Sequence, residues 1–208
     1  MSALYDAPHE FEPLLPAPAK QEPLLSKAHD LSRSAMALAG RPSPPELRGL
    51  LRAMNSYYTN RIEGQHTRPH ELEQALCKDF SGDAKLAARQ RLALAHIDTE
   101  AELETRYAGD AGAQALFSPP AIRDIHRALF ERLPEADLQT DAGVALTPGQ
   151  LRRQAVSVGR HSAPAAASLA EFIERWSSFY GGVRRGEATL IAIAAAHQRL
   201  GWIHPFID

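Results

Sequence analysis

The sequence predicts an all-α protein that contains one small β element. Apolar residues recur at steps of three or four over most of the chain, which is the period of an α-helix. Between residues 134 and 165 that period is lost, and glycine and proline punctuate the chain. Within this interval Ala155-Val156-Ser157-Val158 alternates loosely, which is typical of a short strand or of half a hairpin.

The N-terminal half is predicted to be a proline-rich arm followed by a helical region. Residues 1–23 contain five prolines, which lack an amide donor and restrict the preceding residue, so we expect an extended arm and no helix there. The composition leaves open whether this arm is a disordered tail or lies over the surface. Residues 24–113 are predicted to be helical. Their second helix, at about residues 45–64, ends with Gly64 as a C-cap, and residues 108–113 form a linker.

Residues 114–208 are predicted to form a second helical block. Ser118-Pro119 is a favourable helix start, because serine can cap the first amides and proline suits the first turn. Helical spacing continues to Leu133, then returns over residues 169–180 and from about Gly186 to Leu200. Trp176, Phe179 and Tyr180 are expected in the core.

Composition and charge argue against several classes of protein. The 208 residues carry a formal net charge of -2, with 23 basic and 25 acidic residues, so no basic excess indicates nucleic acid or an anionic membrane as a partner. Cys77 is the only cysteine, which excludes an intrachain disulfide and fits a reducing compartment. Residues 1–13 lack lysine and arginine, unlike a signal peptide, and no apolar run is long enough to span a membrane. We expect a cytoplasmic protein.

The segment that points to chemistry is the end of the sequence. An apolar helix runs into His204-Pro205, where proline forces the chain out of the helix, so the histidine can present its ring to a cleft. Asp208, four residues later, could hold a cation beside that ring. From the residues alone, a solvated histidine and carboxylate remain the commoner arrangement. No His-Glu-x-x-His motif or cysteine cluster predicts a dedicated metal site.

Three segments together resemble the Fic family, whose motif reads His-Pro-Phe-x-(Asp/Glu)-Gly-Asn-Gly-Arg-x-x-Arg. The first half of that motif is matched by His204-Pro205-Phe206-Ile207-Asp208. The segment that leads into the family's β-hairpin flap is resembled by Gly149-Gln150-Leu151-Arg152 and Val156-Ser157-Val158-Gly159. The inhibitory motif (Ser/Thr)-x-x-x-Glu-(Gly/Asn) is matched by Thr59-Asn60-Arg61-Ile62-Glu63-Gly64. The resemblance implies a Fic-type helical core with a small hairpin flap over residues 114–208, preceded by a region with an inhibitory helix.

The resemblance also implies a protein AMP-transferase. His204 would be the general base that takes the proton from a Ser, Thr or Tyr hydroxyl of a target protein, whose oxygen then attacks the α-phosphorus of ATP. Asp208 would bind Mg²⁺ beside the phosphates, because a carboxylate is the hard oxygen ligand that this ion prefers. Pro205 and Phe206 would fix the loop as packing residues.

A flap and a brake follow from the same resemblance. Val156, Val158 and Gly159 would form the flap that holds the target chain in line, and Arg152 would brace it. Glu63 would inhibit by pairing with the last arginine of the motif, in the place of the γ-phosphate. Thr59, four residues earlier on the same helix face, and Gly64 complete the inhibitory motif.

Two other histidines are predicted to be structural. His197 is seven residues before His204, which places it two turns earlier on one helix face, and we expect it to be buried and hydrogen-bonded. His126 is expected to pack inside its helix bundle.

The sequence departs from the family motif after Asp208. The 208 residues lack Gly-Asn-Gly-Arg-x-x-Arg, whose amides and arginines would bind phosphate. By the resemblance, the C-terminal part of the core, which begins with the helix that this segment opens, is expected to be missing. Two hypotheses follow: a truncated protein AMP-transferase, or a non-enzymatic Fic remnant that binds proteins through its helices and flap. Transfer of UMP or phosphocholine, or removal of AMP, stays open, as do the target and the oligomeric state.

Residues 1–208 by themselves are therefore expected to transfer AMP at a negligible rate. His204 would have a hydroxyl to activate but no anchored phosphorus beside it, and positioning can supply ~7–11 kcal/mol of a barrier. Incubation with labelled ATP, Mg²⁺ and a lysate checks this expectation. Robust label transfer that His204→Ala abolishes would contradict it.

Overall fold

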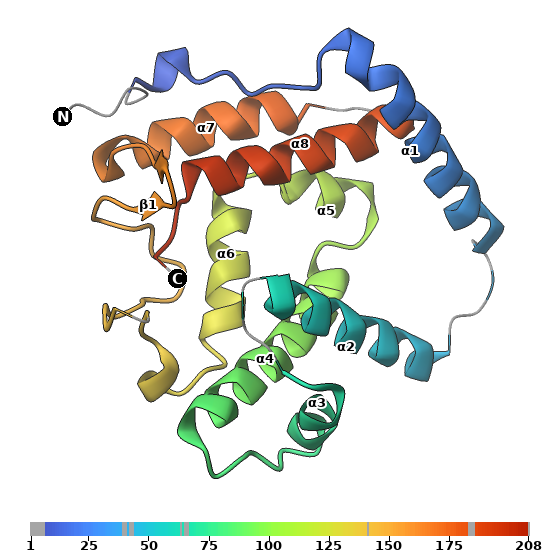
Figure 1. The fold of residues 1–208 in the computed structure, drawn as a ribbon. Helices are drawn as coiled ribbons and strands as arrows, with labels where there is room; N and C mark the ends of the chain where they lie inside the picture. The colour runs from blue at the N-terminus through green and yellow to red at the C-terminus, as the bar shows by residue number, and fades with distance from the viewer. Residues whose placement is uncertain are drawn as a thin grey trace. The chain divides into compact units, whose positions relative to one another are not determined.

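The computed structural model describes residues 7–38, 41, 44–62, 64, 67–140, 142–182 and 186–207 (Figure 1). Within this part of the chain, eight α-helices and one antiparallel β-hairpin form, which confirms the predicted fold class. The chain divides into two compact units: unit 1 comprises Met1–Arg41, Ala113–Ile122 and Gln150–Asp208, and unit 2 comprises Pro42–Gly112 and Arg123–Gly149. None of the described helices is both long enough and apolar enough to cross a membrane.

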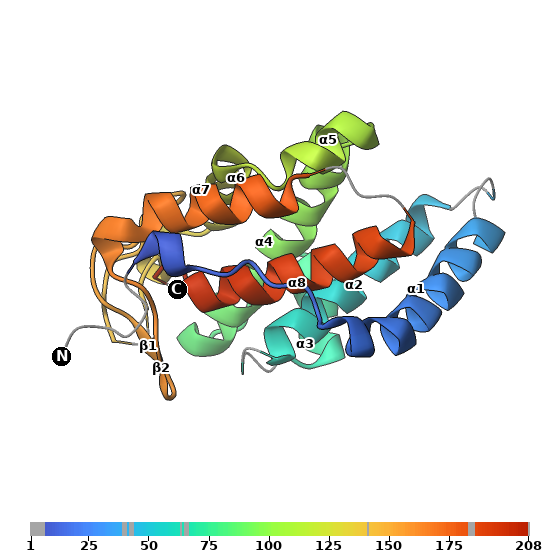
Figure 2. The ribbon, with the colours of Figure 1, turned by 90° about the horizontal axis from the view of Figure 1, so that it is seen from above.

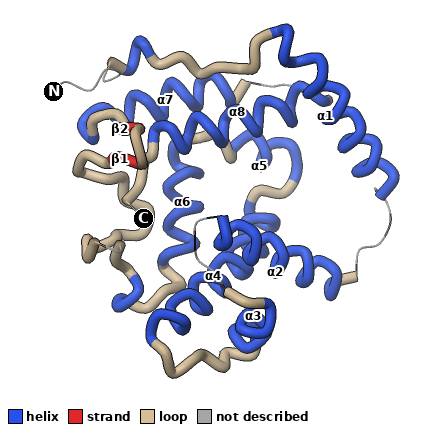
Figure 3. The backbone as a smooth tube through the Cα atoms, in the orientation of Figure 1, coloured by secondary structure: helices blue, strands red, loops and turns tan. Residues whose placement is uncertain are grey.

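Helix dominates both units, as the tube in Figure 3 shows. Unit 1 contains α1 (Pro18–Leu38), α7 (Leu169–Tyr180), α8 (Glu187–Ile203) and the strands β1 (Ser157–Val158) and β2 (His161–Ser162). Unit 2 contains α2 (Pro45–Ile62), α3 (Pro69–Leu76) and α4 (Ala84–Arg106). Two helices have residues in both units, α5 (Gly109–Ala115) and α6 (Pro119–Phe130). Three single turns of 3-10 helix complete the description: Pro8–Glu10, Glu135–Asp137 and Ala166–Ser168.

Unit 1 is built on an apolar core between α7 and α8. Phe172, Ile173 and Trp176 of α7 and Ala196 and Ile203 of α8 are buried together. The indole nitrogen of Trp176 donates to the carbonyl of Ala196 at 2.8 Å, so this large side chain is buried with its polar atom satisfied. The predicted core position is therefore confirmed for Trp176 and Tyr180, whereas Phe179 is half-buried and packs against that core.

An N-terminal segment, residues 7–17 and here called the strap, is held against α7 and α8 (Figure 1, Figure 2). The buried ring of Phe11 is stacked on Trp202 and meets Phe172 edge to face, each at a centroid distance of 5.5 Å. Side chains of the two helices donate to strap carbonyls: Arg175 Nε to Phe11 at 2.5 Å, Arg199 Nη2 to Glu12 at 2.7 Å and Tyr180 Oη to Leu14 at 2.8 Å. The described part of the proline-rich arm thus lies on the helices of unit 1.

The expectation that no helix forms before Leu24 is wrong. α1 begins at Pro18 and contains Pro23. Proline is tolerated in the first turn of a helix, where its missing amide has no partner to lose. Pro23 lies beyond that turn, so α1 lacks one hydrogen bond of its own there, and the helix packs against α8.

The linker predicted for residues 108–113 is also wrong, because α5 begins there. Gly109 opens the helix with a φ of 76°, in the left-handed region that favours glycine. A Cβ on Gly112 would lie 2.5 Å from the backbone of Tyr107, so glycine permits a close approach. The two glycines that suggested a linker therefore serve a tight turn into a short helix.

In unit 2, α2 and α3 pack against the long helix α4. Leu72, Ala93 and Ile97 form a small buried cluster. Within the contact between α2 and α4, Ser56 Oγ donates to the carbonyl of Ala93 at 2.8 Å, and Asn60 Nδ2 donates to Ser56 Oγ at 3.1 Å. These buried polar contacts fix which face of α2 meets α4.

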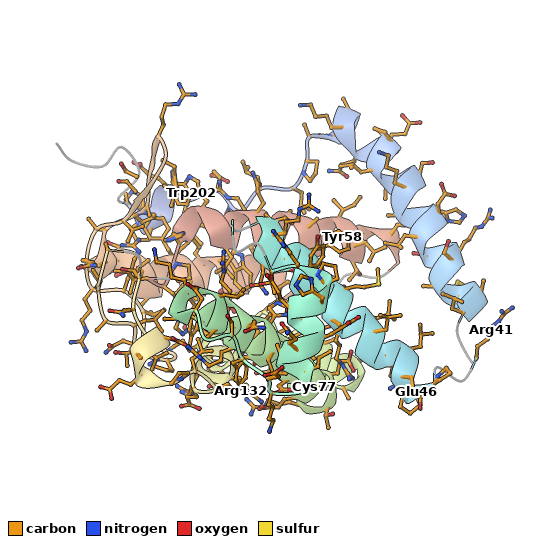
Figure 4. The ribbon with its side chains drawn as sticks, turned by 60° about the horizontal axis from the view of Figure 1, so that its bottom comes forward. Arg41, Glu46, Tyr58, Cys77, Arg132 and Trp202 are labelled. Atoms are coloured by element: carbon orange, nitrogen blue, oxygen red, sulfur yellow. The ribbon has the colours of Figure 1, made fainter. Side chains whose placement is uncertain are left out.

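The apolar stripe of α2 is not the face that packs on α4. Its side chains are 44 to 82% exposed in the part of the chain that the structure describes, and Figure 4 labels one of them, Tyr58; the stripe is Leu47, Leu51, Met54, Tyr58 and Ile62. The helical period of the sequence is confirmed, and the buried face of α2 is the more polar one.

A buried histidine holds the last residue of unit 2. His126 on α6 is 6% exposed, and its Nδ1 accepts a hydrogen bond from the amide of Gly149 at 2.8 Å. The carbonyl of Gly149 accepts from Arg123 Nε at 3.0 Å. Gly149 has a φ of 73°, and a Cβ there would lie 3.0 Å from the Arg127 side chain, so glycine is required. Burial lowers the pKa of His126 to about 4. The packing role predicted for His126 is confirmed.

Phe11→Ala is expected to destabilise the chain by about 3–5 kcal/mol, because it leaves a cavity between Phe172 and Trp202. Leu14→Ala is the matched control in the same segment, since its side chain is 55% exposed and its loss should change stability by only about 0.5 kcal/mol. Urea unfolding, followed by tryptophan fluorescence, measures both. Equal effects of the two substitutions would show that Phe11 does not anchor the strap.

Acidification is expected to destabilise the fold as pH falls from 6.5 to about 4. The unfolded chain protonates His126 near its ordinary pKa of 6.5, whereas the folded chain does so only near 4, so the unfolded state binds more protons in this window. Stability therefore rises with pH across the window. Thermal unfolding of wild type and His126→Asn, which keeps an acceptor but does not titrate, measures the effect. An equally steep pH dependence in both would assign it to other groups.

Candidate active site

α8 ends at Ile203, and the chain leaves the helix at His204. The amide of His204 still donates to the carbonyl of Leu200 at 2.9 Å, but its backbone is left-handed, with φ 49° and ψ 67°. Pro205 accounts for the exit, because the residue before a proline avoids the right-handed helical region. A left-handed histidine is uncommon and persists where its surroundings hold it. The residue is half-buried, which leaves the imidazole within reach of a ligand.

The carbonyls of this exit are held by Arg152, which is 3% exposed. Its Nε donates to the carbonyl of His204 at 2.6 Å, and its Nη2 donates to that of Ile203 at 3.3 Å. The Arg152 amide donates to the carbonyl of Pro205 at 2.9 Å. The last carbonyls of a helix lack partners within the helix, so donors from elsewhere must satisfy them. Arg152 supplies those donors around His204.

The same guanidinium holds both ends of the hairpin. Nη1 donates to the carbonyl of Gln154, which precedes β1, at 2.9 Å, and Nη2 donates to that of Pro164, which follows β2, at 2.6 Å. Burial lowers the pKa of Arg152, although a guanidinium stays charged at any ordinary pH. The surrounding carbonyl dipoles replace the water that a buried cation loses. Arg152 therefore connects the hairpin to the His204 turn.

The hairpin itself is short and open to solvent. β1 and β2 pair with Ser157 opposite Ser162 and Val158 opposite His161. Gly159 closes the turn with a φ of 60°, and Val158 is 54% exposed. Figure 3 shows the two strands beside the end of α8 at which the chain turns. An exposed strand edge next to a histidine is an arrangement that can receive an extended peptide.

A second link joins the hairpin to α8. His161 Nε2 donates to the carbonyl of Trp202 at 2.8 Å, and its ring lies 5.3 Å from the indole. Figure 4 labels Trp202 near the C-terminal end of α8. Four consecutive carbonyls, from Trp202 to Pro205, thus accept a hydrogen bond from either His161 or Arg152. The sequence pattern did not predict this role of His161, whose only signal is its place two residues after Gly159.

Several residues singled out in the sequence lie together in unit 1. Pro205 is buried behind His204, and Phe206 packs against the core of unit 1. The carbonyl of Val156 accepts a hydrogen bond from the amide of Ala163 at 3.0 Å, which extends the hairpin ladder. The loop and hairpin residues named from the sequence therefore form one hydrogen-bonded region.

The residues of the inhibitory motif belong to unit 2. Thr59 is exposed on α2, and Gly64 follows the end of that helix with a φ of 78°. Glu63 and Asp208 lie outside the described residues. In the described ranges, no group of three or more His, Cys, Asp or Glu side chains is placed to hold a metal ion.

The prediction that His197 is buried and hydrogen-bonded is wrong, because this histidine is exposed. The buried stripe of α8 consists of Ala192, Ala196 and Ile203, and His197 lies beside it. The left-handed turn also takes His204 off the helix face on which the two-turn spacing placed both histidines.

Comparisons with known proteins show what this region is similar to. Residues 116–208 match the model of the Fic/DOC family. The fold is similar to the crystal structure of a Fic family protein from Desulfovibrio desulfuricans G20, with a TM-score of 0.66 and 17% identity, over 95% of this chain and 55% of that chain. The chain thus spans about half the length of that protein. No curated protein matches it. The hairpin, Arg152 and His204 lie within a segment that matches the Fic/DOC family, in a chain whose fold is similar to that of a Fic family protein.

Proposed function

We propose that this chain belongs to a protein AMP-transferase. Such an enzyme moves AMP from ATP to a Ser, Thr or Tyr hydroxyl of a target protein in the presence of Mg²⁺. One observation carries the proposal: a half-buried histidine lies at a left-handed helix exit, and Arg152 donates both to the carbonyls of that exit and to those at the two ends of the hairpin. The match of residues 116–208 to the Fic/DOC family supports the class of reaction.

His204 acts as the general base in this proposal. An unprotonated nitrogen of its ring accepts the hydroxyl proton of the target as the hydroxyl oxygen bonds to the α-phosphorus of ATP. The bond from that phosphorus to the departing pyrophosphate breaks. An imidazole suits this step, because its ordinary pKa lies near neutral pH. Gln154 and Pro164, held by Arg152, fix the base of the hairpin that presents the target.

The hairpin would bind the target as an added strand. Val158 is exposed, and Gly159 carries no side chain that could block an approaching backbone. A short two-stranded ladder leaves main-chain donors and acceptors for a further strand. A target in that place would lie beside the His204 turn, because the hairpin and the turn share the hydrogen bonds of Arg152.

Asp208 would hold the Mg²⁺ ion. Its carboxylate offers the oxygen ligand that Mg²⁺ prefers, and phosphate oxygens of the nucleotide would complete the shell. When bound, the ion neutralises charge that builds up on the phosphates.

Glu63 is proposed as a brake on this reaction. The helix that leads to it is firmly seated in unit 2: Ser56 bonds to α4, and Arg52 pairs with Glu104 at 2.5 Å. Gly64 takes the left-handed conformation that ends a helix. In this proposal the negative charge of the Glu63 carboxylate keeps a phosphate group out of the place that the carboxylate occupies.

The activity test uses protein expressed from the intact gene, with α-labelled ATP, Mg²⁺ and a cell lysate. Glu63→Gly is expected to raise label transfer, because it removes the brake. His204→Ala in that background should lower the rate by about 10²–10⁴-fold, the usual contribution of a general base. His197→Ala, an exposed histidine of the same helix, is the matched control and should leave the rate unchanged.

Parallel assays with labelled UTP and a phosphocholine donor identify the transferred group. If label is transferred from one of these donors and not from ATP, the transferred group is UMP or phosphocholine and not AMP. Absence of transfer by the Glu63→Gly protein from every donor would refute the enzyme and favour a protein-interaction module. Transfer that survives His204→Ala would remove His204 as the base.

A further inference from the structure

The end of α8 is completed by donors from the hairpin region. In most helices, the final carbonyls bond to water or to residues just beyond the helix. Here the carbonyl of Trp202 accepts a hydrogen bond from His161, and the carbonyls of Ile203 and His204 accept hydrogen bonds from the guanidinium of Arg152. The conformation of the turn therefore depends on where the hairpin lies.

The far side of the same helix end is fixed. Trp202 is stacked on Phe11 at 5.5 Å, lies 6.0 Å from the ring of Phe172 and has the Arg199 guanidinium 4.9 Å from its centroid. Close-packed aromatic contacts of this kind resist displacement. Because Trp202 is held in place, a movement of the hairpin is expected to shift the turn at His204 and not the indole ring.

His161 connects the exposed strand of the hairpin to this helix end. It lies opposite Val158, an exposed residue of β1, so the position of β1 sets the position of the imidazole. The imidazole bonds to the carbonyl two residues before His204. A strand that binds along β1 would thus change the position of the His204 backbone through His161 and through Arg152, because Arg152 bonds to both ends of the hairpin.

We infer that His161, together with Arg152, is a positioning residue that couples occupation of the hairpin to the orientation of His204. Neither side chain contacts the reacting atoms. Each acts on the backbone that carries the base, so an ordered hairpin and a correctly turned histidine are formed together. The catalytic consequence rests on the proposed transferase activity, whereas the structural coupling does not.

The structural coupling is tested on residues 1–208 by NMR of the histidine rings, with the His204 signals assigned from their loss in His204→Gln. His161→Phe keeps a ring on Trp202 but loses the donor, whereas His161→Gln keeps a donor near the position of Nε2. The His204 signals are expected to shift and broaden in His161→Phe and to stay near wild type in His161→Gln. Arg152→Met should also perturb them, and Arg153→Met, an exposed neighbour, is the matched control.

The kinetic test uses protein expressed from the intact gene in the Glu63→Gly background. His161→Phe is expected to lower kcat for label transfer by about tenfold, and Arg152→Met by about 10²-fold, the cost of a misplaced catalytic group. KM for ATP should stay within about twofold, because neither residue contacts the nucleotide in this proposal. His161→Gln should recover most of the lost rate.

The outcomes separate this inference from the proposed function. Unchanged His204 signals in His161→Phe would overturn the coupling, whether or not the protein is an enzyme. Loss of the folded state in Arg152→Met, seen by circular dichroism, leaves the decision to the two His161 variants. Perturbed His204 signals in a protein without transferase activity would support the coupling and refute the transferase. A loss of kcat in His161→Gln but not in His161→Phe would show that ring packing matters, not the hydrogen bond, and would overturn the coupling.

Discussion

The buried guanidinium of Arg152 is the interaction on which the candidate site depends. A helix that stops at a proline leaves carbonyls without partners, and an unsatisfied buried carbonyl is costly. Arg152 satisfies those around His204 and, with its remaining N–H groups, those at both ends of the hairpin. Its planar fork of five donors makes this possible, since lysine has only three donors at a single point. One side chain thus defines the turn and the flap together.

The aromatic cluster around Trp202 brings a distant part of the sequence to this site. Phe11 enters the core of unit 1 and stacks on Trp202, although the match to the Fic/DOC family begins only at residue 116. Arg175 and Arg199 donate to the carbonyls of Phe11 and Glu12 and so fix the backbone at Phe11 and directly after it. The structural unit around the site is therefore larger than the segment that the family comparison identifies, and its N-terminal strap belongs to it.

The buried polar groups of unit 2 show a different principle. α2 presents Ser56 and Asn60 to α4 and leaves its apolar stripe exposed. A hydroxyl inside a helix contact specifies one register, because only one alignment gives it a carbonyl partner. His126 acts similarly at Gly149, because its Nδ1 accepts a hydrogen bond from the Gly149 amide. In both places a polar contact selects the geometry and apolar packing stabilises it.

The sequence alone determined most of the local structure, although the start of α1 at Pro18 and the helix α5 were not predicted. The period of apolar residues predicted the helices, the loss of that period predicted the hairpin, and Pro205 predicted the exit at His204, because each is a property of neighbouring residues. Tertiary structure decided the rest. Arg152 contacts His204, which is 52 positions away in the sequence, and Phe11 contacts Phe172, which is 161 positions away. No local sequence signal predicts such pairs. Packing likewise decided three other features: the exposure of His197, the inclusion of Pro23 in a helix and the burial of the polar face of α2. A helix has several possible faces, and only its neighbours in space determine which one is buried.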